Sequence, residues 1–150
     1  MHAAGWKVGS YRGVQIRLHV TLLLLLPYLV FITYVRFQAL ARSAGIAPEQ
    51  LALGPLAWGL VMAVLLFTSV LVHEFGHVLV ALKQGARVRS ITMMMLGGIS
   101  DIEEIPENPS QEFRLAVVGP MVSLALSALG YGLFRLTRSP NLAFVSLWFG

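Results

Sequence analysis

The sequence predicts an all-α integral membrane protein with about three transmembrane helices, the start of a fourth, and a short extended or β segment between the second and third. Composition is the first reason, because 57% of the 150 residues are apolar and only 12% are charged, against about 25% charged in a typical soluble domain. The placement of charge is the second reason. The 11 Lys and Arg residues form no run and instead flank long uncharged intervals, as charges at membrane borders do. We therefore expect the lipid bilayer as a partner, and no nucleic acid.

Three intervals of the chain lack Lys, Arg, Asp and Glu. The first has 18 residues, Leu18 to Val35, which is about 27 Å of helix and close to the thickness of the hydrocarbon core. The second has 23 residues, Gln50 to Val72, and its helical character continues to about Leu82. The third has 20 residues, Leu115 to Phe134, and is rich in small residues that let helices pack closely in lipid.

The sequence after the third interval reads as a turn at Arg138 to Asn141, followed by an apolar stretch, Leu142 to Gly150, that is too short to cross a membrane. We treat residues 1–150 as one membrane-embedded domain that is truncated at its C-terminus. Lys and Arg number seven on the side that holds the N-terminal arm and the second connection, and four on the other side. The positive-inside rule then places the N-terminus in the cytoplasm.

One short segment at the end of the second interval indicates metal chemistry. It reads His73-Glu74-Phe75-Gly76-His77, which fits the pattern H-E-x-x-H. On a helix the two histidines face the same way and can bind one zinc ion, while Glu74 can act as general base toward the water that zinc activates. The chain has no cysteine, so any metal must be held by His, Asp or Glu. A chance match is the alternative, but two histidines and a glutamate within apolar sequence are costly unless they are paired or bind a metal.

Four segments carry a family pattern in a fixed order: Gly13–His19, Ser69–His77, Leu96–Ile99 and Ala116–Pro120. They resemble the N-terminal part of the site-2 protease family, the intramembrane zinc metalloproteases of peptidase family M50. In order, they are similar to the entry to that family's first helix, its zinc helix, the glycine pair that follows, and the Ala-x-x-Gly-Pro segment of its next helix. The resemblance implies an intramembrane zinc endopeptidase in a prokaryotic cell membrane. It also implies transmembrane protein substrates, His73 and His77 as zinc ligands, and Glu74 as the catalytic residue.

The connection between the second and third intervals is predicted to be extended from Val88 to Ile102, with Gly97 and Gly98 as a turn or a close approach of the backbone. In the family a similar segment forms strands that pair with an unwound substrate, so the resemblance implies that Gly97 and Gly98 bind substrate. The run Met93 to Met95 is interpreted as packing. Gly76, between the two histidines, is interpreted as a residue that permits close helix packing.

The family's third zinc ligand is an Asp in a later motif that this sequence does not contain. Asp101 stands among acidic residues that we interpret as a solvated face, and it is not assigned as a ligand. Because catalytic zinc sites normally use three protein ligands, we expect residues 1–150 alone to bind zinc weakly and to lack protease activity. His19, at the edge of the first interval, is interpreted as an interfacial or helix-pairing residue rather than a ligand.

Two other functions stay open from the sequence. A non-catalytic metal-binding or transport protein would use the same histidines, although a transporter needs polar residues on several helices and these intervals offer almost none besides His19. An inactive fragment or pseudoprotease that serves as a membrane partner would explain the missing Asp motif. No pattern in the sequence indicates which substrate is cut or which oligomer forms.

Overall fold

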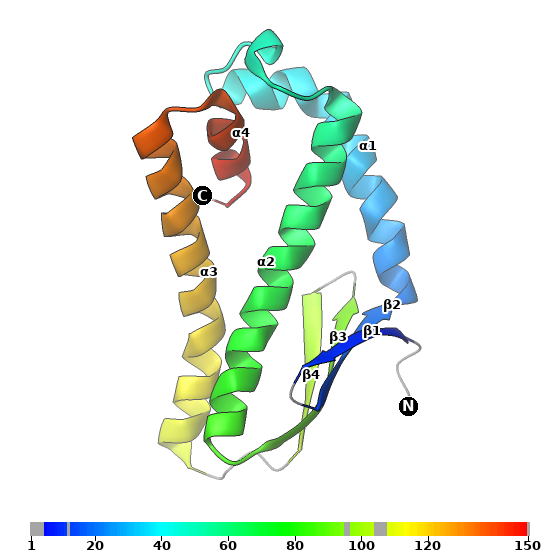
Figure 1. The fold of residues 1–150 in the computed structure, drawn as a ribbon, viewed down its shortest axis with the longest axis vertical. Coiled ribbons are helices and arrows are strands. Elements are labelled where there is room, and N and C mark those ends of the chain that lie inside the picture. Colours follow the sequence, from blue (N-terminus) through cyan, green and yellow to red (C-terminus); the bar gives the residue numbers. More distant parts are fainter. Residues whose placement is uncertain (1–4, 12, 95–96, 104–107, 150) are drawn as a thin grey trace. The chain divides into compact units, whose positions relative to one another are not determined.

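A computed structural model describes residues 5–11, 13–94, 97–103 and 108–149 (Figure 1). The strands are β1 Gly5–Tyr11, β2 Val14–His19, β3 Arg87–Met94 and β4 Gly97–Glu103. The helices are α1 Val20–Ser43, α2 Pro55–Lys83, α3 Pro109–Thr137 and α4 Pro140–Phe149, with a 3-10 turn at Pro48–Gln50. Contacts divide the chain into two compact units, residues 1–25 with 68–123 and residues 26–67 with 124–150. Each of the three long helices contributes a part to both units.

Each uncharged interval forms the greater part of one long helix, α1, α2 or α3. By length and composition, each of these three helices is long and apolar enough to cross a membrane. Both α2 and α3 begin at a proline, Pro55 and Pro109, because the first helical position needs no backbone N–H donor. Asn108 caps α3, since its Oδ1 accepts a hydrogen bond from the Ser110 backbone N–H at 3.0 Å.

The turn predicted at Arg138 to Asn141 is confirmed at Arg138 and Ser139, whereas Pro140 and Asn141 already belong to the next helix. Helix α3 ends at Thr137, Arg138 takes the left-handed conformation with φ 51°, and α4 begins at Pro140. A residue with positive φ, most often glycine, commonly follows the last turn of a helix and lets the chain change direction, and here Arg138 has that conformation. The apolar stretch after the turn is therefore a helix, as expected for the start of a fourth.

The first unit contains a four-stranded sheet, of which the predicted extended or β segment between the second and third helices makes up half. Its order is β1-β2-β3-β4: β2 pairs antiparallel with β1 and parallel with β3, and β3 pairs antiparallel with β4. The extended segment Val88 to Ile102 was expected, but β1 and β2 were missed. Val14, Ile16 and Leu18 alternate with polar residues in β2, which is the period of a strand. Gly13, with φ 86°, supplies the positive φ that a tight turn before β2 requires.

Gly97 and Gly98 are the first two residues of β4 rather than a turn. They pair with Met94 and Met93 of β3, so their backbone is extended and approaches the neighbouring strand closely. Met93 is buried, at 2% exposure, which confirms the interpretation of this position as packing. Met95 lies outside the described residues.

The second unit is held together by an apolar core around Phe144 of α4. This side chain is fully buried and contacts Phe37 of α1 and Trp58 of α2 edge to face, with ring centroids 5.7 and 5.0 Å apart. The other buried members are Ala41, Ile46, Leu51, Met62 and Ala143. Helix α4 is short, yet its apolar residues complete the core of this unit.

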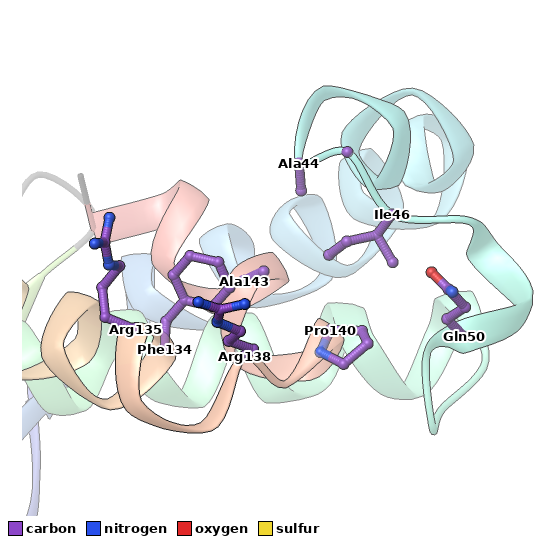
Figure 2. A pocket seen from close by; sticks show the side chains of 9 residues that line it. Ala44, Ile46, Gln50, Phe134, Arg135, Arg138, Pro140 and Ala143 are labelled. Atoms are coloured by element: carbon purple, nitrogen blue, oxygen red, sulfur yellow. The ribbon is translucent and has the colours of Figure 1, made fainter.

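A cavity of about 470 Å³ also belongs to the second unit (Figure 2). Ile46, Phe134 and Ala143 give it apolar walls, and Arg135 and Arg138 give it basic ones. Every residue that lines this cavity lies in the second unit, whereas the segment His73 to His77 lies in the first. The cavity is therefore not part of the candidate site described next.

Candidate functional site

The segment His73 to His77 lies on the C-terminal half of α2, within the first unit. In that unit this half of α2 lies between α3 and the sheet (Figure 1). His73 and His77 are one helical turn apart, and their Nε2 atoms are 3.3 Å from each other. Two imidazole nitrogens bound tetrahedrally to zinc, each at about 2.0–2.1 Å, are about 3.3 Å apart. The distance between the two Nε2 atoms therefore fits one shared metal ion.

The other nitrogen of each ring is held by α3. His77 Nδ1 lies 2.7 Å from the backbone oxygen of Leu115, and His73 Nδ1 lies 2.8 Å from Ser123 Oγ. A carbonyl oxygen can only accept, so His77 Nδ1 carries the hydrogen and donates it. In the neutral ring this leaves the lone pair on Nε2, where a metal binds.

Gly119 of α3 provides the space in front of the two Nε2 atoms. It is buried, and a Cβ atom at this position would overlap the Nε2 atoms of both His73 and His77. Any other residue would therefore place its side chain where the ring nitrogens point. The sequence suggested only a packing role for Gly119, because spacing along α3 does not show which residues of α2 it faces. The donor atoms, their separation and this clear space together fit a zinc ion.

Glu74 is joined to the sheet by a hydrogen bond. Ser100 of β4 donates its hydroxyl to Glu74 Oε2 at 2.8 Å. A second contact lies beside it, because Tyr11 of β1 and Phe75 of α2 stack edge to face with ring centroids 5.8 Å apart. No sequence pattern indicated Ser100, because its contact with Glu74 depends on how β4 pairs and on which face of the sheet meets α2.

Close packing of α2 on α3 explains Gly76. A Cβ atom there would lie 2.9 Å from Cγ2 of Val122 and 3.5 Å from Cγ2 of Val118. The two helices therefore approach each other closely between the two histidines. This confirms the interpretation of Gly76 as a packing residue.

Two further residues singled out in the sequence lie apart from the histidine pair. His19 precedes α1, and its Nδ1 accepts a hydrogen bond from the backbone N–H of Thr21 at 3.3 Å, as a helix-capping side chain does. Asp101 is exposed on β4 and alternates to the opposite face of the strand from Ser100. Across the described ranges of the chain, His, Asp and Glu side chains form no group of three that could hold a metal.

Residues 61–143 match the family model described as peptidase family M50. The chain belongs to peptidase family M50. The matched residues include both histidines, Glu74, Gly119 and Ser123, so the whole arrangement on α2 and α3 lies within the part that defines membership.

The M50 chain is similar to three curated proteins that are named as zinc metalloproteases. One from Synechocystis is 42% identical over 120 residues, which are 80% of this chain and 30% of that protein. Rip3 of Mycobacterium tuberculosis is 37% identical over 90 residues, 57% of this chain and 23% of that protein. MJ0392 of Methanocaldococcus jannaschii is 29% identical over 114 residues, 76% of this chain and 28% of that protein. The M50 chain thus spans less than a third of the length of these relatives.

A solved structure has the same fold. The site-2 protease from Methanocaldococcus jannaschii superposes with a TM-score of 0.69, covering 97% of this chain and 60% of that one. Sequence identity between the two is 24%, so the likeness is evidence for the fold alone.

Proposed function

We propose that this M50 chain is the metal-binding part of a membrane-embedded zinc endopeptidase that cleaves transmembrane proteins. One observation carries the proposal: the Nε2 atoms of His73 and His77 are 3.3 Å apart, and α3 contacts the Nδ1 atom of each ring. Glu74 follows His73 on the same helix. This is the donor set of a catalytic zinc site that lacks its third protein ligand. The family resemblance assigns that ligand to an Asp in a later motif, outside the residues described.

Each of the chain's own residues then has a defined task. His73 and His77 would hold the ion, which when bound would supply a Lewis acid for the peptide carbonyl and would lower the pKa of water toward about 7. Glu74 accepts the proton of the attacking water and delivers it to the leaving amine. Ser100, which donates to Glu74 Oε2 at 2.8 Å, restricts the orientations that this carboxylate can adopt.

The sheet offers an edge strand, β4, to which an extended substrate segment could pair. A peptide bond within a helix is shielded by its own hydrogen bonds, so a transmembrane substrate must be extended where it is cut. Among the described strands β4 pairs with β3 alone, and Ser100 of β4 contacts the proposed base. A substrate strand added beside Gly97 and Gly98 would gain backbone hydrogen bonds close to Glu74.

The membrane location of the site rests on the three long apolar helices. Hydrolysis in hydrocarbon requires water, so the proposal includes a polar path to His73 and His77. It also places the protein in a prokaryotic cell membrane, since the relatives come from Synechocystis, Mycobacterium and Methanocaldococcus. The charge count alone supports a cytoplasmic N-terminus.

The proposal is tested by separating metal binding from catalysis in the full-length gene product. Glu74→Gln is expected to retain bound zinc and to lose at least roughly 100-fold in cleavage of a transmembrane reporter, because it removes an acid/base group that is not a ligand. His73→Ala is expected to lose zinc and cleavage together. Zinc is measured by elemental analysis of the protein in detergent, and cleavage by the reporter fragments.

Substantial cleavage by the Glu74→Gln protein, alongside an active wild type, would contradict the assigned mechanism. Glu49→Gln is a suitable control because Glu49 lies in the second unit, on the short turn before α2. This variant is expected to match the wild type in both zinc content and cleavage.

A metal-binding membrane protein without protease activity is the second candidate. It is favoured by the finding that the described residues bring together two histidines but no group of three ligands. Full-length protein that holds zinc firmly, keeps it in the Glu74→Gln variant and yet cleaves no transmembrane reporter would support this candidate.

A further inference from the structure

Three positions of α3 face the two histidines, and they are spaced one helical turn apart. The backbone oxygen of Leu115 contacts His77, Gly119 clears the space before both rings, and Ser123 contacts His73. Residues at i, i+4 and i+8 lie on one side of a helix. We call these three positions the α3 stripe. The stripe runs opposite in direction to the histidines of α2, since Leu115 contacts His77 and Ser123 contacts His73.

The two ends of the α3 stripe differ in chemistry. At Leu115 the partner is a carbonyl oxygen, which accepts a hydrogen from His77 Nδ1 and commits Nε2 to be the lone-pair nitrogen. At Ser123 the partner is a hydroxyl, which can accept from His73 Nδ1 or donate to it. His73 can therefore bind metal through Nε2 only when the Ser123 oxygen is the acceptor.

We propose that Ser123 is the positioning residue for His73, orienting the ring and accepting its Nδ1 hydrogen so that Nε2 is presented to zinc. This inference rests on the proposed function. It gives a role to a residue for which the sequence of α3 suggested only close helix packing. Partners of this kind behind a metal-binding histidine are worth about 10- to 100-fold in metal affinity. Ser123 touches neither substrate nor metal and acts through His73.

A packing role and a positioning role make opposite predictions for alanine. Alanine is as small as serine, so Ser123→Ala keeps the approach of α3 to α2 but removes the oxygen. Ser123 is exposed in the described part of the chain, so the extra methyl group of threonine can be accommodated while the hydroxyl is kept. Comparing Ala with Thr at position 123 therefore separates the loss of the hydroxyl from a change in packing.

The experiment measures zinc affinity of the full-length protein in detergent by competition with a chromophoric chelator. Ser123→Ala is expected to weaken zinc binding about 10- to 100-fold, and Ser123→Thr is expected to stay within about threefold of the wild type. Ser127→Ala is the matched control, because Ser127 lies one turn further along α3 and in the second unit. Zinc binding by Ser123→Ala within about threefold of the wild type would overturn the inference.

A second measurement examines the His73 ring directly and does not require bound zinc. In metal-free protein the ¹⁵N shifts of the His73 ring are expected to change in Ser123→Ala, while those of His77 stay as in the wild type. Unchanged His73 shifts would overturn the inference even if zinc binding were altered. A wild-type protein with no zinc affinity would instead contradict the proposed function, and the His73 shifts would still show whether Ser123 holds the ring.

Discussion

Gly119 is the residue at which a single added carbon has the largest expected effect on the metal site. Its Cβ would overlap both Nε2 atoms, so Gly119→Ala is expected to abolish zinc binding while leaving the helical content unchanged. Zinc analysis and far-ultraviolet circular dichroism of the purified protein measure the two properties. Gly130→Ala is the control, because Gly130 lies on the same helix and a Cβ there meets nothing within 4 Å. A Gly119→Ala protein that binds zinc normally would show that the ion does not sit between these rings.

At the scale of residues, the sequence predicted the parts of the site that are close together in the chain. His73, Glu74 and His77 form a local pattern with a known chemical meaning, and their helix is as expected. Gly119 and Ser100 could not be assigned their contacts in this way. Their roles depend on which side of α3 faces α2 and on the register of β4, and neither is set by local sequence.

At the scale of elements, α2 has two glycines in close contact with neighbouring helices, one facing backbone atoms and the other facing a side chain. A Cβ on Gly59 would lie 2.9 Å from the backbone Cα and O of Val30, whereas a Cβ on Gly76 would lie 2.9 Å from a methyl group of Val122. Backbone atoms cannot rotate away and a side-chain methyl group can. We therefore expect Gly59→Ala to destabilise the protein by about 1–3 kcal/mol and Gly76→Ala to destabilise it less.

Thermal unfolding of the metal-free protein in detergent measures this difference, since removing zinc separates packing at Gly76 from any effect on its neighbours His73 and His77. Gly132→Ala is the reference, because a Cβ at Gly132 meets nothing within 4 Å and the change should stabilise the helix by up to about 1 kcal/mol. A Gly76→Ala protein less stable than Gly59→Ala would contradict the expected order.

The helices were predictable and half of the sheet was not, for a physical reason. A membrane-length apolar run is a local property, so the three intervals identified α1, α2 and α3. The strand β2, by contrast, pairs in parallel with β3, where Gln15 lies beside Ser90. The paired residues are 75 positions apart, so the alternation of Val14, Ile16 and Leu18 is the one local sign of β2. Six residues of alternation are a weak signal next to a long apolar run.

At the scale of the whole molecule, the sheet supports one feature of the predicted topology. The N-terminal arm forms β1 and β2, the connection after α2 forms β3 and β4, and all four belong to one sheet. Because strands of one sheet lie side by side, we expect the N-terminal arm and the connection after α2 to be on the same side of the membrane. The charge count predicts the same pairing and adds that this side is cytoplasmic.

Absence of cysteine from the chain allows a direct test of this topology. Single cysteines replacing the exposed residues Lys7, Arg87 and Arg42 can be labelled in intact cells with a maleimide that does not cross membranes. Only Arg42→Cys is expected to react from outside, and the other two should react after the cells are opened. Labelling of Lys7→Cys in intact cells would refute a cytoplasmic N-terminus.

Helix α3 contacts one histidine through its backbone and the other through a side chain, and this difference affects which mutations each contact can survive. His77 is held by the backbone of Leu115, and a backbone oxygen is present whichever amino acid a mutated gene specifies there. His73 is held by the side chain of Ser123, which a single nucleotide change can replace. A substitution at position 115 therefore leaves the partner of His77 in place. Under the role proposed for Ser123, the partner of His73 is kept only by amino acids that place an oxygen near Cβ. The partners of the two proposed zinc ligands therefore differ in how easily a mutation can remove them.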